Sequence, residues 1–226
     1  TVNDDLMSWR RKAAIGLQYA LKRSGPLSWY AGLAGGFART RAELDRPDVQ
    51  FHFFPYSTDR TDPSLHRFSG FTLSVCKLRP ESRGTVEIKS ADAHAAPAIQ
   101  PNFLERESDV ATMLDGLKLV RKLAATPALA RWIVAEHDPG PDCTSDDQLV
   151  DFIRKKGMTV YHPVGTCKMG ADAEAVVDSQ LRVHGVQGLR LVDASVMPIV
   201  TSGNTNAPVI MIAEKAAEMI RGRQRA

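Results

Sequence analysis

Several features that would place this chain in a familiar class of protein are missing from its 226 residues. It has only three cysteines, Cys76, Cys143 and Cys167, and their wide spacing is not that of metal ligands. An odd, sparse set of cysteines indicates a reducing compartment and argues against a disulfide framework. No apolar run approaches the roughly 18 residues that a membrane-spanning helix needs. The net charge of +3, with lysine and arginine spread along the chain, argues against a nucleic-acid-binding protein.

The glycine fingerprint of dinucleotide-binding folds, Gly-x-Gly-x-x-Gly, is also absent. The chain begins with Thr1 rather than Met, and a helical pattern follows almost at once. We therefore interpret it as a fragment or a processed product of a longer protein. No signal peptide is recognisable. The reducing compartment that the cysteines indicate favours the cytoplasm, with peripheral association at the inner membrane as the alternative.

The first third of the chain contains one helical pattern followed by strands. Asn3 is a candidate N-cap for a helix that stops at Gly25-Pro26, and residues 29–46 are predicted to form a glycine-rich loop. Residues 49–56 alternate as a strand does. Residues 71–78 and 85–89 are predicted to pair as an antiparallel hairpin.

The remainder is mainly helical and ends in a strand and a helix. Helical patterns occupy residues 108–125, Pro127 to about residue 137, Ser145 to Gly157, and a last segment from about Ala207. Two short strands are expected at residues 181–183 and 189–192. This order predicts an α+β fold in which helices cover an antiparallel sheet.

The last predicted strand, residues 189–192, is too short to form a sheet of its own. A lone strand that ends in Asp193 is typical of an open α/β sheet, where ligands bind at strand C-termini. We therefore expect residues 1–180 to form a substrate-binding domain. Residues 181–226 are expected to be the closing strand and helix of an α/β domain whose main part is missing.

Two segments carry the functional information: Tyr161-His-Pro-Val-Gly-Thr-Cys-Lys-Met-Gly170 and Gly203-Asn-Thr-Asn-Ala-Pro208. The first places a histidine in a loop, and the second places two carboxamides before a helix. An imidazole, with a reference pKa of about 6.5, is suited to take a proton near neutral pH. An amide can hold a substrate oxygen, and a helix N-terminus stabilises negative charge.

With the stretch from Val177 to Pro198 and Ile212-Ala-Glu-Lys-Ala-Ala217, these segments closely resemble the C-terminal part of the glucose–methanol–choline oxidoreductases. The branch that they resemble most contains choline dehydrogenase and bacterial FAD-dependent alcohol dehydrogenases. The resemblance implies FAD as cofactor, bound mainly by an N-terminal dinucleotide fold that would precede Thr1. It also implies a small-molecule alcohol as substrate.

The resemblance assigns roles to individual residues. The family's catalytic histidine falls on His162 and its partner on Asn204, which lies 204 − 162 = 42 residues later. Asp193 and Ala194 would contact the ribityl and pyrophosphate part of FAD. Asn204 and the backbone at Thr205 would approach the flavin ring.

Each assignment has a simpler alternative. His162 alone could be a structural loop histidine, and Asn204 could be an N-cap, although Asn206 is the better candidate for a plain cap. If the register were shifted, Asn206 would be the catalytic amide. Asp193 could merely end a strand. A metal site is not expected, because no histidine has ligand-like spacing.

The alternatives for the whole chain are a non-catalytic fragment that cannot bind FAD alone, and a lyase of the same family. The identity of the alcohol and of the electron acceptor, oxygen or a quinone, stays open at this stage.

Overall fold

The computed structural model describes residues 1–30, 32–59 and 64–222, and these form two compact units. Unit 1 contains residues 1–77 and 111–157, and unit 2 contains residues 78–110 and 158–226. The expected α+β class, with small antiparallel sheets and helices, is confirmed. Each unit is described by itself.

A three-stranded antiparallel sheet organises unit 1. Strands β1 (Ala34–Ala38), β2 (Val49–Phe54) and β3 (Thr72–Lys77) lie in that order. The alternation in residues 49–56 therefore predicted β2 correctly. The prediction of a glycine-rich loop at residues 29–46 was wrong over β1, because pairing with β2 overrides the low strand propensity of glycine. Residue 31 lies outside the described residues.

The predicted hairpin between residues 71–78 and 85–89 does not form. β3 pairs instead with β2, in a register that places Val49 opposite Lys77 and Phe54 opposite Thr72. Strand pairing joins segments far apart in sequence, so a short turn between two strand patterns does not by itself select the partners.

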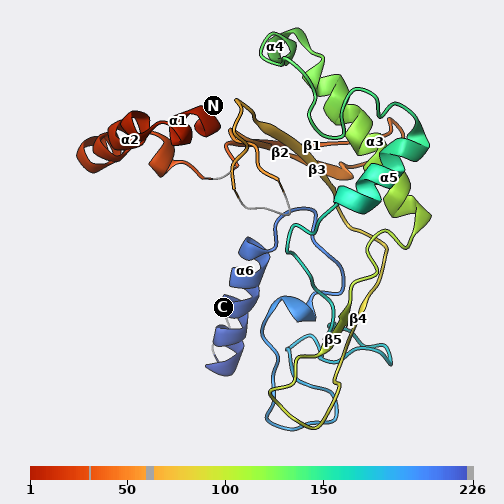
Figure 1. Ribbon diagram of the computed structural model, residues 1–226. Helices are drawn as coiled ribbons and strands as arrows, with labels where there is room; N and C mark the ends of the chain where they lie inside the picture. The colour runs from red at the N-terminus through yellow and green to blue at the C-terminus, as the bar shows by residue number, and fades with distance from the viewer. Residues whose placement is uncertain (31, 60–63, 223–226) are drawn as a thin grey trace. The chain divides into compact units, whose positions relative to one another are not determined.

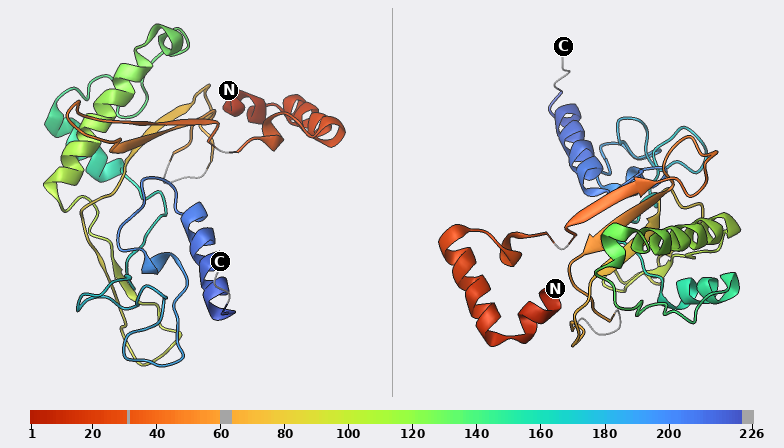
Figure 2. Two further views of the ribbon diagram at one scale, coloured as in Figure 1. Left: turned by 180° about the vertical axis from the view of Figure 1, so that it is seen from behind. Right: turned by 90° about the horizontal axis from the view of Figure 1, so that it is seen from above.

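Helices α3 (Glu107–Ala124) and α5 (Asp146–Lys156) lie beside this sheet (Figures 1 and 2). A Cβ added at Gly116 of α3 would lie 3.0 Å from a Val75 methyl group, so the absence of a side chain lets helix and sheet approach closely. Lys118 Nζ of α3 contacts Asp146 Oδ1 of α5 at 2.6 Å.

The structure confirms the predicted bounds of one helix in this unit and shortens another. The capping box at Ser145 is present, with Ser145 Oγ accepting from the Gln148 N–H at 3.2 Å, and Gly157 ends α5 as predicted. The helix predicted from Pro127 to about residue 137 stops earlier, because α4 covers only Pro127–Ala130. Its sequence supplies a Pro at the first turn but no side-chain cap.

The N-terminal helical pattern is divided into α1 (Val2–Met7) and α2 (Trp9–Lys22), followed by the 3₁₀ turn η1 (Pro26–Ser28). Asn3 is not the N-cap that was expected, since Thr1 has that position. Asn3 is fully buried, and its amide donates to the carbonyl oxygens of Ser57 at 2.8 Å and His66 at 2.9 Å. It therefore connects α1 to a distant loop.

Unit 2 contains little regular structure. Strands β4 (Thr85–Glu87) and β5 (Ala98–Gln100) form a two-stranded antiparallel sheet, and η2 (Ala194–Val196) and α6 (Asn206–Ile220) complete the unit (Figure 1). The strands predicted at 181–183 and 189–192 are reduced to isolated bridges, such as Arg182 with Arg190. Segments this short do not form a ladder without neighbouring strands.

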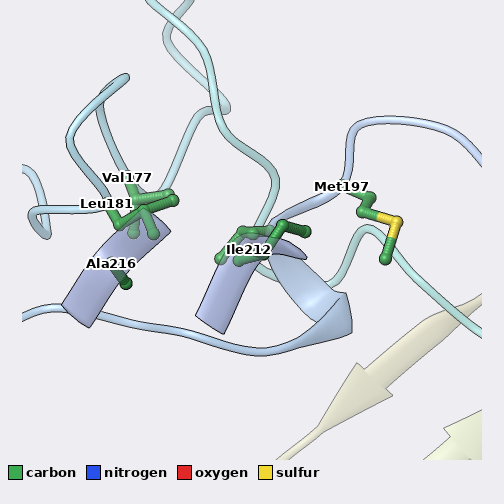
Figure 3. Close-up of a cluster of buried hydrophobic side chains, with 6 residues drawn as sticks. Val177, Leu181, Met197, Ile212 and Ala216 are labelled. Atoms are coloured by element: carbon green, nitrogen blue, oxygen red, sulfur yellow. The ribbon is translucent and has the colours of Figure 1, made fainter. Parts of the chain in front are cut away.

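The core of unit 2 joins loops to one face of α6 (Figure 3). It consists of six buried side chains: Val177, Leu181, Val196, Met197, Ile212 and Ala216. Ile212 and Ala216, one turn apart on α6, are the helix residues in this core, whereas the apolar residues Ala213 and Ile220 of the same helix are exposed. The same core contacts Val164, which follows the histidine of the first motif by two residues.

Among the described residues, no helix has the length and hydropathy needed to cross a membrane.

Candidate functional site

The loop that carries His162 begins with an unusual backbone conformation. Tyr161, directly before the histidine, has φ of 59°, and its N–H donates to Thr159 Oγ1 at 2.9 Å. A bulky residue in this region of φ is uncommon and costs free energy, so it persists where surrounding contacts impose it. The conformation determines the direction in which the next side chain leaves the loop.

Backbone hydrogen bonds attach this loop to η2. The N–H groups of Gly165 and Cys167 both donate to the Ser195 carbonyl at 3.1 Å, and the Met169 N–H donates to the Val196 carbonyl at 2.9 Å. Gly165 has φ of 91°, a conformation that suits a glycine. The glycine in the motif is thus explained by the turn that follows His162.

The second motif forms the turn that leads into α6. The Gly203 N–H donates to the Thr201 carbonyl at 2.8 Å, and the Arg79 guanidinium donates to Ser202 Oγ. Pro208 is the third residue of α6, in the first turn, where a proline needs no backbone N–H. Ile212 and Ala216 anchor the helix in the core of unit 2, which holds its first turn in place (Figure 3).

The two motifs meet at the imidazole of His162. Asn204 Nδ2 lies 2.8 Å from His162 Nε2, and Thr205 Oγ1 lies 3.0 Å from His162 Nδ1. The imidazole is half-buried, Asn204 is exposed and Thr205 is buried. Two residues predicted as a functional pair from motifs 42 positions apart are therefore in direct contact.

Thr205 is the contact that sequence reasoning missed. Its backbone was expected near a cofactor, and its side chain was given no role. A signal was present, because the hydroxyl of a threonine at a helix start commonly hydrogen-bonds to a nearby group. The sequence does not say which partner, since the histidine ring comes from another loop.

Thr205, rather than Asn206, is the N-cap residue of α6. Asn206 is the first helical residue and is exposed. The expectation that Asn206 is a plain cap was therefore wrong by one residue. The amide in contact with the ring belongs to Asn204, which favours the original register of the motif over the shifted one.

Asp193 caps the short turn η2. Its Oδ1 accepts from the Ser195 N–H at 2.7 Å. This is a local structural role, as in the simpler alternative given for Asp193. The residue is exposed and Ala194 is half-buried. Their assignment to a cofactor stays a prediction, because capping through one oxygen leaves the carboxylate accessible.

The other histidine and cysteine side chains that could carry chemistry lie elsewhere or have structural contacts. His52 is on β2 in unit 1, opposite Ser74, with its ring stacked on Phe54 at a centroid distance of 6.1 Å. Cys167 is a half-buried residue of the His162 loop. Within the described ranges, no group of three or more His, Cys, Asp or Glu side chains is arranged to hold a metal ion.

Comparisons with known proteins identify the family of this chain. The family model described as GMC oxidoreductase matches residues 80–213, a range that includes both motifs. Alcohol dehydrogenase (acceptor) of Pseudomonas putida is 45% identical over 92% of this chain and 38% of its own length. Oxygen-dependent choline dehydrogenase of Paraburkholderia xenovorans is 43% identical over 96% of this chain and 39% of its own.

Solved structures show the same fold. Pyridoxine 4-oxidase of Mesorbium loti superposes with a TM-score of 0.79 and 29% identity over 86% of this chain and 39% of its own. Formate oxidase of Aspergillus oryzae gives 0.85 and 26% over 94% of this chain and 42% of its own. The chain spans about two-fifths of the length of these relatives. Since the family model covers more than half of the chain, the protein belongs to the GMC oxidoreductase family.

Proposed function

We propose that this chain is part of an FAD-dependent oxidoreductase that oxidises a primary alcohol to an aldehyde. His162 is the base and Asn204 holds the substrate oxygen. The observation that carries the proposal is the 2.8 Å contact between Asn204 Nδ2 and His162 Nε2. It brings a proton acceptor and a donor for an alcohol oxygen to one point of unit 2.

The contact also suggests how an alcohol would bind. An amide nitrogen only donates, so the lone pair of Nε2 is already engaged by Asn204. A substrate hydroxyl would displace the amide from the ring and donate its own hydrogen to Nε2. The released Asn204 N–H would then donate to the substrate oxygen and hold the alcohol in a reactive orientation.

His162 would then take the hydroxyl proton as the alcohol is oxidised. The O–H bond breaks and an Nε2–H bond forms, which leaves the imidazole with a positive charge. FAD, when bound, supplies the acceptor for the hydride that leaves the alcohol carbon. The role of this chain is to accept the proton and orient the oxygen.

The start of α6 fits the edge of a flavin. No side chain caps its first turn, and Asn204, Asn206 and Ala207 are exposed there. The N–H groups of the first turn and the positive end of the helix dipole would stabilise negative charge on the flavin. Asp193, Ala194 and the Thr205 backbone are the other residues of this chain that we assign to FAD.

We further propose that the remainder of the protein supplies most of the FAD site. In this scheme residues 1–180 are the substrate-binding domain and residues 181–226 complete the flavin-binding domain. Ile210, Met211 and Ile220 of α6 are 55%, 59% and 62% exposed. A helix with apolar side chains on its outer side is typical of one that is covered by further protein.

Anaerobic reduction of the purified flavoprotein tests the function. We expect an alcohol to bleach the flavin absorbance, and aldehyde to appear in equal amount. Choline and a longer primary alcohol are the two substrates to compare, because the relatives are named for choline and for alcohols. Substrate turnover without bleaching would instead indicate the lyase alternative, and absence of both would contradict the proposal.

The fragment alternative is tested separately with residues 1–226 alone. The sequence has no glycine fingerprint, so we expect this chain by itself to bind no stable FAD and to have no activity. Titration with FAD, followed by flavin fluorescence and gel filtration, measures this directly. A yellow protein after gel filtration would contradict the expectation.

A further inference from the structure

Both nitrogens of the His162 ring have partners in the turn that opens α6. Nε2 lies 2.8 Å from the Asn204 amide nitrogen, and Nδ1 lies 3.0 Å from the Thr205 hydroxyl oxygen. The hydroxyl contact is the more protected of the two, since Thr205 is only 7% exposed. Successive residues of one turn therefore hold opposite sides of the imidazole.

The chemistry of the partners determines where the ring proton is. The amide nitrogen of Asn204 has hydrogens and no lone pair to offer, so Nε2 must accept. A neutral imidazole has one accepting nitrogen and one that carries hydrogen. The hydrogen is therefore on Nδ1, and the Thr205 oxygen accepts it.

The helix itself does not use this hydroxyl. A threonine at an N-cap commonly accepts a hydrogen bond from an N–H in the first turn, and this stabilises the helix. Thr205 is the N-cap of α6 but makes no side-chain cap. Its hydroxyl is directed to the ring instead, which is a use that helix stability does not explain.

We propose that Thr205 is a positioning residue: by accepting from Nδ1–H, it stabilises the tautomer that the Asn204 amide selects, in which the Nε2 lone pair is available to a substrate. The catalytic meaning rests on the proposed alcohol oxidation, but the tautomer does not. When the substrate O–H bond breaks, its proton goes to Nε2 and the ring becomes positively charged. The Nδ1–H donor then already has an acceptor, so the charged ring gains a stronger hydrogen bond without moving.

The tautomer is measured by NMR of the native protein labelled with ¹⁵N-histidine. Two-bond and three-bond ¹H–¹⁵N correlations distinguish a nitrogen that carries hydrogen from one with a free lone pair. The His162 signals are assigned by their loss in His162→Gln. We expect Nδ1 to carry the hydrogen in the wild type, and an Nε2–H form would overturn the proposal.

Three variants separate the hydroxyl from the packing of the side chain. Thr205→Val keeps the shape and removes the acceptor, and we expect it to shift the ring towards the Nε2–H form. Thr205→Ser restores an acceptor and should restore the wild-type tautomer. Thr201→Val is the matched control in the same turn, because the Thr201 hydroxyl bonds to the Gly203 carbonyl rather than to the ring. An unchanged tautomer in Thr205→Val would overturn the proposal.

Kinetics of the flavin-loaded protein give the second readout. A lost hydrogen bond to a charged group predicts a fall in kcat on the order of 10- to 100-fold for Thr205→Val, with recovery in Thr205→Ser. The pH profile of kcat/KM should also move in Thr205→Val. If Thr205→Val has the kcat and the pH profile of the wild type in an active enzyme, the proposal is overturned. A protein that oxidises no alcohol would defeat the proposed function alone, because the NMR result still decides the tautomer.

Discussion

The two units of this chain are ordered in different ways. In unit 1, β2 is paired along its length with β1 on one side and β3 on the other. In unit 2, the strands are three residues long, and the loops are joined by isolated bridges and single backbone bonds. The proposed site lies in the second kind of structure, where each side chain depends on a few specific contacts.

Backbone strain follows the same division. Of the non-glycine residues with positive φ in the described ranges, unit 1 contains Arg23, and unit 2 contains the other five: Arg79, Asn102, Leu104, Tyr161 and Leu181. Tyr161 lies next to the proposed base. Unfavourable backbone conformations cluster at sites where a side chain must be aimed, and they are maintained by the surrounding fold.

The largest expected effect is that of replacing the proposed base, and it tests whether the active site lies in unit 2. We expect His162→Ala in the flavin-loaded protein to lower kcat by about 10²- to 10⁴-fold, the range for loss of a general base. The flavin content should stay near that of the wild type. The control is His94→Ala, at an exposed histidine of unit 2 outside the motifs. Near-normal turnover of His162→Ala, measured by flavin bleaching, would contradict the assignment.

Core substitutions compare how the two units depend on packing. Ile212→Ala in α6 and Leu149→Ala in α5 remove side chains that are 9% and 1% exposed. Each should lower the free energy of unfolding by about 2–5 kcal/mol in urea titrations. Because α6 begins at the proposed site, Ile212→Ala should also lower kcat of the folded protein, whereas Leu149→Ala should not. If the two variants lower kcat equally, the activity does not depend on the packing of unit 2 more than on that of unit 1.

Unit 1 also contains a buried polar side chain with specific hydrogen bonds, that of Asn3. Asn3→Ala removes hydrogen bonds to the Ser57 N–H, the Ser57 carbonyl and the His66 carbonyl. Groups left unpaired in a buried place predict a loss of about 1–3 kcal/mol. Hydrogen exchange should become faster in α1 and near Ser57. Gln18→Ala, at an exposed position of α2, is the matched control and should change neither.

The smallest effect is expected from acid. The Arg182 N–H and then the Arg182 guanidinium lower the pKa of Asp178 from 3.8 to about 2. A carboxylate with a lowered pKa stabilises the folded state above its unfolded pKa, and this contribution is lost as pH falls from about 4 to about 2. Asp178→Asn should therefore make unfolding in unit 2 less dependent on pH in this window. An unchanged slope in urea titrations would contradict it.

Local sequence patterns were most successful where the structure is local. The capping box at Ser145, the helix end at Gly157 and Pro208 in the first turn of α6 are each determined by residues within a few positions. Alternation along β2 likewise follows from one segment. The motifs identified His162 and Asn204 because each segment is long and distinctive.

The features that the sequence did not predict depend on contacts between distant segments. The partner of β3 and the role of Asn3 depend on segments that are distant in the chain, and the isolated bridges at residues 181–192 reflect neighbours rather than propensity.

The sequence by itself therefore determined the family, the mixed helix and sheet composition, and the histidine and amide that are candidates for catalysis. Only the tertiary structure decided that they touch and that Thr205 binds the other side of the ring. The physical reason is that a hydrogen bond needs two groups within about 3 Å, and that distance is determined by the packing of two loops against α6.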